Sequence, residues 1–112
     1  MTPIQELNQR FMRDTPMVRM GGIASDLARV TRLASAPTPD LSAVGNVIKE
    51  IKYFTEWMAG DLNLDAQEMI LSLQRTIAQW KDETLEESLD QIRQKSREWS
   101  ETILQISGLL KG

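Results

Sequence analysis

The chain has 112 residues, of which 41% are hydrophobic and 26% are charged, and its formal net charge is −3. This length and composition predict one globular domain over residues 1–112, with a single hydrophobic core. The sequence contains no cysteine and no histidine. Disulfides, thiol catalysis and histidine-based metal sites are therefore excluded, and we expect no catalytic residue, no metal site and no cofactor.

The charges are unevenly distributed along the chain. Residues 1–35 carry five arginines and three acids, whereas the remainder has a net charge of −5. The acidic total, and the lack of aromatic residues among the arginines, argue against nucleic-acid binding. No apolar run reaches the roughly 18 to 20 residues of a membrane span, and no signal peptide is visible. We expect a soluble, cytoplasmic protein that binds neither nucleic acid nor membrane.

Threonine–proline pairs precede the first two amphipathic patterns of the chain. Threonine can cap a helix, and proline suits the first helical position because its missing amide would be unpaired there. The pair at Thr2 begins a short helix over residues 3–13, with a capping box. The pair at Thr15 begins a longer helix over residues 16–35.

Two consecutive glycines, Gly21 and Gly22, lie inside the second helical pattern. Each glycine in a helix costs about 1 kcal/mol relative to alanine. We therefore expect either a closely packed neighbouring helix or a kink at this point.

A third threonine–proline pair at Thr38 predicts a helix over residues 39–59. Tyr53 and Trp57 lie one helical turn apart on it, away from the centre of its apolar stripe. We expect the first helix to cover them, and the alternative is a homodimer or partner interface. Met17 and Met20, near the start of the second helix, could contribute to an adaptable binding surface, although we favour core filling.

The last third of the chain predicts two helices, over residues 65–82 and 84–110, with a tight turn between them. Asp65 should cap the first of these helices, and Thr84 with Glu87 fits a capping box for the second. The phase of the apolar stripe also breaks at this turn. The alternative is one long helix whose apolar face rotates.

The fifth predicted helix carries a regular apolar seam of the kind that packs in bundles and coiled coils. Its members are Leu89, Ile92, Ser96, Trp99, Ile103 and Ile106. Because this helix is longer than the fourth, we expect it to overhang the bundle, which favours self-association.

One segment resembles the start of a calcium-binding loop, because Asp61, Asn63 and Asp65 alternate between two helices. A calcium loop of this type needs glycine at its sixth position and glutamate at its twelfth, where this chain has Ala66 and Ser72. We therefore expect an ordinary polar loop.

Together these patterns predict an all-α, four-helix-bundle-like domain with a short additional N-terminal helix. The expected function is that of a non-enzymatic interaction module, such as a small adaptor, regulator or assembly subunit, that self-associates, most simply as a dimer. An alternative is a bundle that binds an apolar ligand between its helices, lined by Trp80, Trp99 and Ser96. A third is an enzyme using Tyr53, a lysine or a carboxylate with a perturbed pKa.

Overall fold

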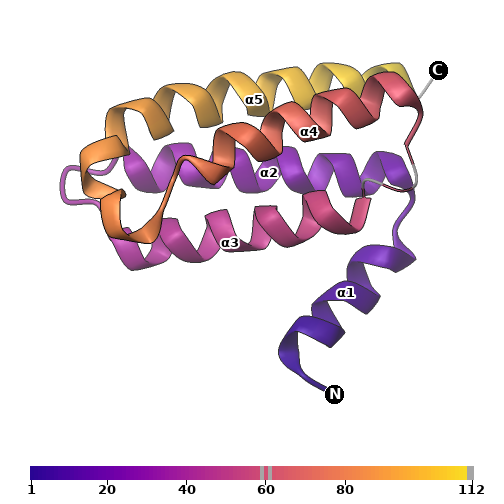
Figure 1. Ribbon diagram of the computed structural model, residues 1–112, viewed down its shortest axis with the longest axis horizontal. Coiled ribbons are helices and arrows are strands. Elements are labelled where there is room, and N and C mark those ends of the chain that lie inside the picture. The colour runs from indigo at the N-terminus through magenta and orange to yellow at the C-terminus, as the bar shows by residue number, and fades with distance from the viewer. Residues whose placement is uncertain (59, 61, 111–112) are drawn as a thin grey trace.

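The computed structural model describes residues 1–58, 60 and 62–110, and the side chains of residues 107–110 lie outside this description. The described chain is all-α, a helical bundle with a short N-terminal helix, as the sequence predicts. The helices are α1 (Pro3–Arg13), α2 (Pro16–Ala34), α3 (Leu41–Met58), α4 (Leu64–Ala78) and α5 (Leu89–Leu110) (Figure 1).

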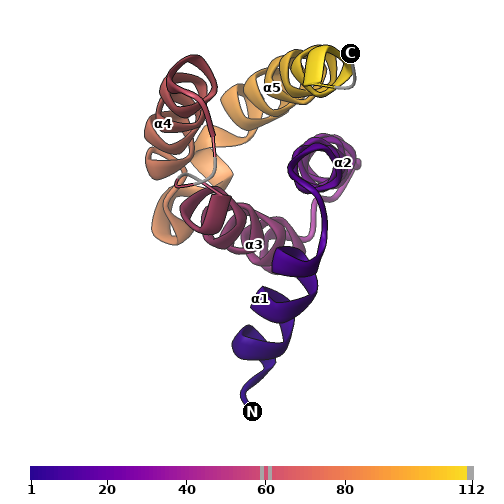
Figure 2. The ribbon, with the colours of Figure 1, turned by 90° about the vertical axis from the view of Figure 1, so that its right-hand side faces the viewer.

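Helix α2 organises the bundle. It packs most extensively against α5 and next against α3, while α4 packs against α3 (Figure 2). Leu27, Ile51, Ile70 and Ile92, from these four helices, are each fully buried. No helix in the described part of the chain has the length and apolar character needed to cross a membrane.

Helix α1 does not run along the bundle but projects from one end of it (Figures 1 and 2). Its capping box is confirmed: the Gln5 amide donates to Thr2 Oγ1 at 3.1 Å, and the Thr2 amide donates to Gln5 Oε1 at 2.8 Å. The cap at Thr15 is also confirmed, because its hydroxyl accepts from the Val18 amide at 3.3 Å.

The predicted starts of the third and fourth helices are wrong by one or two residues. Helix α3 begins at Leu41, not at 39, because the carboxylate of Asp40 accepts from the Ala43 amide at 3.1 Å. Its predicted end at residue 59 lies outside the described residues. Helix α4 is capped by Asn63, whose Oδ1 accepts from the Ala66 amide at 2.9 Å, and not by Asp65.

The expected interruption between the last two helices is present and includes the predicted turn at Asp82–Thr84, but it is longer than predicted, and the capping box expected at Thr84 does not form. Helix α4 ends at Ala78, and the chain then forms two short 3₁₀ turns before α5 begins at Leu89. Thr84 lies in the first of these turns, and its hydroxyl donates to the Lys81 carbonyl at 3.4 Å. Two buried side chains, Trp80 and Leu85, hold this connection against the core.

The close approach of a neighbouring helix expected at the glycine pair is wrong, and the chain is not broken there. Helix α2 is continuous through Gly21 and Gly22, and a Cβ added at either position would meet no atom within 4 Å. The pair therefore leaves open space beside α2.

Helix α5 lies antiparallel to α2 and is fixed there by polar contacts. Ser96 Oγ lies 2.7 Å from Thr31 Oγ1, and Ser100 Oγ donates to the Ala24 carbonyl at 2.9 Å. Helix α5 has 22 residues and packs along α2, which has 19 residues. Helix α4, with which its length was compared, has 15 residues. The seam of α5 therefore packs inside the bundle.

Candidate interaction surface at α1

An aromatic cluster joins the C-terminal end of α1 to α3. The Phe11 ring stacks on Phe54, with centroids 4.4 Å apart and an angle of 11° between the ring planes. Trp57 lies beside both rings, with its centroid 5.9 Å from Phe11 and 6.0 Å from Phe54. Tyr53 stacks on the outer side of this cluster, 5.4 Å from Trp57. Stacked and tilted pairs at these distances are favourable beyond the area that they bury.

The side chain of Arg19, in α2, holds the same end of α1 by hydrogen bonds to two backbone carbonyls of α1. The buried guanidinium donates from Nε to the Phe11 carbonyl at 3.2 Å and from Nη2 to the Met12 carbonyl at 2.8 Å. The last carbonyls of a helix lack their usual partners within the helix. The Phe11 carbonyl also accepts from the Asp14 amide at 3.2 Å, and Arg19 adds a charged donor at both carbonyls, which fixes the direction in which α1 leaves the bundle.

The N-terminal half of α1 is much less covered. Ile4 has 44% of its surface exposed and Met1 has 74%, whereas Phe11 has only 5% exposed. Leu7, between them along the helix, is half-buried. Helix α1 is therefore anchored at one end and presents apolar side chains to solvent at the other.

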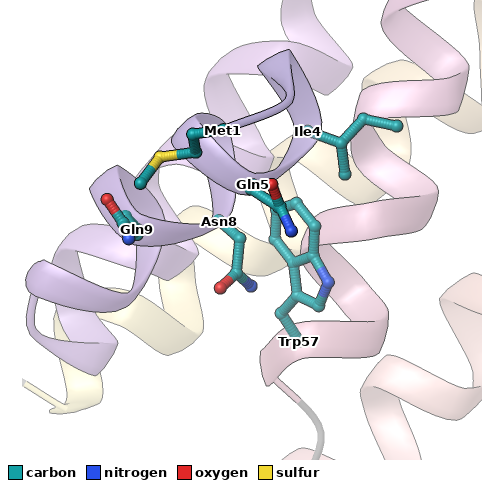
Figure 3. Close-up of a pocket in the computed structure, with 6 residues that line it drawn as sticks. All are labelled: Met1, Ile4, Gln5, Asn8, Gln9 and Trp57. Carbon is teal, nitrogen blue, oxygen red and sulfur yellow. The ribbon is translucent and has the colours of Figure 1, made fainter.

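An open groove runs between this exposed half of α1 and Trp57, with a volume of about 550 Å³ (Figure 3). We call it the α1 groove. It is lined by Met1, Ile4, Gln5, Asn8, Gln9 and Trp57. None of these side chains is charged, and three of them end in amides.

The sequence-predicted surface residues separate into two groups. Tyr53 and Trp57 lie together at the α1 groove and its edge, both half-buried, and Phe11 supplies part of the expected cover. Met17 is half-buried near the start of α2, whereas Met20 is fully buried and lies in the core.

The predicted seam residues lie at the inner side of α5. Ile92, Ser96 and Ile103 are buried, and the other three, Leu89, Trp99 and Ile106, are half-buried. Of the residues expected to line an internal ligand site, Trp80 is enclosed in the core and Ser96 is engaged by Thr31, while Trp99 faces a surface groove between α4 and α5.

Sequence reasoning missed one buried acid, Asp26 of α2, which is 6% exposed. Its burial, together with a hydrogen bond to Glu50 and the charge of Glu50, raises its pKa to about 8, although Arg29 acts in the opposite direction. The position could have been recognised, because Asp26 is three residues from Ile23 and four from Val30, both of which are buried. Since Asp26 is enclosed between helices, it is not placed to contact a substrate.

Among the residues that the structure describes, no group of three or more acidic side chains could hold a metal ion. The calcium-like segment includes Asp61, which lies outside these residues, and the side chain of Asn63 serves as a helix cap. The chain matches no protein-family model, no curated protein and no solved structure.

Proposed function

We propose that this chain is a non-enzymatic protein–protein interaction module, a small adaptor, regulator or assembly subunit, that dimerises through the α1 groove. The observation that carries the proposal is the projection of α1 from the bundle with Ile4 exposed beside Trp57. An isolated helix of 11 residues is marginally stable in water, because nucleation is costly and few hydrogen bonds repay it. A second chain that covers the exposed half of α1 would stabilise it.

The composition of the α1 groove is typical of the centre of a protein interface. Tryptophan and methionine are enriched at such centres and charged residues are depleted. Trp57 and Met1 supply the first feature, and the uncharged side chains of the lining supply the second. A large aromatic side chain at the middle of a groove is also the usual anchor of binding energy.

The amides of the α1 groove favour a second copy of this chain as the partner. In a two-fold symmetric dimer the same surface is present on both sides and must complement itself. An amide both donates and accepts hydrogen bonds, so Asn8 and Gln9 can pair with their own equivalents across such an axis. A groove lined by carboxylates would repel its own copy.

The test is the molar mass of the chain by light scattering after size-exclusion chromatography, from low to high micromolar concentration. We expect the mass to rise towards that of a dimer. Ile4→Asp places a charge in the α1 groove and should leave a monomer. Leu71→Asp is the matched control, because Leu71 of α4 has 48% of its surface exposed, close to the 44% of Ile4, and lies outside the α1 groove.

Two results would overturn the proposal. The first is a wild-type chain that stays monomeric at high micromolar concentration. The second is an Ile4→Asp variant that dimerises as strongly as the wild type and the Leu71→Asp control.

A further inference from the structure

Helices α4 and α5 form the two walls of a surface groove. Helix α4 packs on α3, and α5 packs on α2, and a groove of about 360 Å³ lies between α4 and α5. We call it the α4–α5 groove. It is lined by Ser72, Thr76, Lys95, Glu98, Trp99 and Thr102, none of which lines the α1 groove. Its volume lies at the lower end of the range of about 300 to 1,000 Å³ that is typical of ligand pockets.

Trp99 presents an aromatic ring to the α4–α5 groove. The side chain is half-buried and packs against the hydrophobic core. Within the part of the chain that the structure describes, neither a second ring nor a cation lies over it, whereas Phe11 has both Phe54 and Arg19. The face of an indole ring is negative and attracts a cation that is placed over it.

The threonine hydroxyls of the α4–α5 groove are left to act as acceptors. Thr76 Oγ1 donates to the Ser72 carbonyl at 3.2 Å, and Thr102 Oγ1 donates to the Glu98 carbonyl at 2.9 Å. Each hydroxyl has a single proton, which these bonds within the helices use, while its lone pairs are unused. A ligand that bonds to these oxygens must therefore donate.

Glu98 and Lys95 place one negative and one positive charge in the α4–α5 groove. Glu98 Oε1 accepts from Gln94 Nε2 at 3.1 Å, and Oε2 lies 3.5 Å from Lys95 Nζ. A carboxylate has about four lone-pair positions, so both oxygens can accept again. Both charged side chains are about half exposed, and an ion pair of this kind is weak enough for another cation to replace Lys95. The chain after Ser35 has a net charge of −5, which also favours a cationic ligand.

We infer that the α4–α5 groove binds an arginine side chain from a basic segment of a partner protein. A guanidinium group is flat, permanently charged and rich in donors. It can stack on the Trp99 ring, pair with Glu98 in place of Lys95, and donate to the threonine hydroxyls. The inference extends the proposed interaction function to a second surface, and it does not require the dimer at the α1 groove.

The test is an NMR titration of the indole N–H signals of the three tryptophans at low salt, with the Trp99 signal assigned through Trp99→Phe. The probe is the blocked peptide acetyl-Gly-Arg-Gly-amide. We expect the Trp99 signal to shift with a Kd on the order of 10 mM, because one side chain makes few contacts. The signals of Trp57 and Trp80 should stay in place, since neither residue lines the α4–α5 groove.

Two further peptides test the chemistry of the ligand. Replacing arginine by citrulline keeps the shape of the side chain and removes its charge, so this peptide should cause little shift. Replacing arginine by lysine keeps the charge but loses the flat group, so it should bind more weakly than the arginine peptide. The arginine titration is repeated in Ile4→Asp, which lacks the proposed dimer contact and should give the same affinity.

Charge variants of α5 test where the ligand lies. Glu98→Gln should weaken binding by about two- to fivefold, the effect of one exposed ion pair. Glu101→Gln is the matched control and should change the affinity much less, because it removes an exposed acid of the same helix that does not line the groove. Lys95→Gln should strengthen binding, because it removes the cation that competes for Glu98.

Four results would overturn the inference. The first two are a Trp99 signal that the arginine peptide leaves unchanged, and a citrulline peptide that shifts it as strongly. The third is equal binding by Glu98→Gln and Glu101→Gln. The fourth is weaker binding by Lys95→Gln, which would mean that the ligand accepts from Lys95. A chain that is monomeric but binds the arginine peptide with the expected preferences would contradict the proposed dimer and leave this inference standing.

Discussion

The rings of Phe11 and Phe54 stack 4.4 Å apart and join α1 to α3 in the core of the bundle. The same phenylalanine is held from a second side, because Arg19 bonds to its carbonyl and places its guanidinium carbon 5.8 Å from the centre of the ring. This combination fixes the C-terminal end of α1 and leaves its N-terminal half extended from the bundle. Phe11 therefore determines where the α1 groove is placed.

Phe11→Ala should release α1 while the rest of the bundle stays folded. Removing a buried phenylalanine side chain typically costs about 3 kcal/mol or more. Because α1 contacts the bundle mainly at this end, the loss should appear locally, as faster hydrogen exchange of the α1 amides with little change in α2 and α5. Phe11→Leu is the control, since it keeps most of the apolar contact and gives up mainly the ring stacking, worth about 1 kcal/mol. Unchanged protection of α1 in Phe11→Ala would show that other contacts hold it.

Gly21→Ala should stabilise the protein. Alanine is about 1 kcal/mol more favourable than glycine inside a helix, and an added Cβ at Gly21 has no neighbour within 4 Å. Gly45→Ala is the contrasting variant, because its Cβ would lie 3.2 Å from Asp82 Oδ1 and 3.4 Å from Leu85 Cδ1. Urea unfolding should give a gain of about 1 kcal/mol for the first variant and no gain for the second. A loss of stability in Gly21→Ala would indicate that the glycine pair has a role outside the helix itself.

The helix starts show which local signals can be predicted from sequence. Thr2 and Thr15 cap their helices as the threonine–proline pairs predict, and the acid beside Thr15, Asp14, instead ends α1. Thr38 was expected to do the same, but Asp40 follows it, and its carboxylate reaches the amide three residues on. The choice between Asn63 and Asp65 was likewise decided by competition between neighbouring acceptors, which depends on the path of the chain.

Parts of the candidate site required the tertiary structure. The spacing of Tyr53 and Trp57 indicates that they lie off the core, and both lie at the α1 groove or its edge. The direction of α1 could not be predicted, because it depends on Arg19 reaching carbonyls seven and eight residues earlier. The effect of Glu50 on the pKa of Asp26 depends on the register between two helices, and no local pattern encodes that register.

The hydroxyl pair between α2 and α5 leads to the last prediction. Thr31 and Ser96 lie 2.7 Å apart, and Ser96 is fully buried. Each hydroxyl also has an acceptor within reach in its own helix, the Leu27 carbonyl 3.1 Å from Thr31 Oγ1 and the Arg93 carbonyl 3.3 Å from Ser96 Oγ. Because each hydroxyl has one proton, one of them donates across the interface while the other donates within its own helix. Ser96→Ala should therefore cost only about 1 kcal/mol, because Thr31 keeps a partner.

A double-mutant cycle with Thr31→Val should give a coupling energy of about 1 kcal/mol, measured by urea unfolding, whereas additive effects would mean that the two hydroxyls do not stabilise each other.

Ser96→Leu tests whether the heptad pattern or the packing of α2 on α5 decides which side chain is stable at this position. From the heptad pattern alone, leucine at the polar position should strengthen the seam. In the folded protein the site is closed by α2, so leucine should instead destabilise the bundle by about 2 kcal/mol through overpacking. A more stable Ser96→Leu variant would mean that α2 and α5 can separate enough to admit the larger side chain.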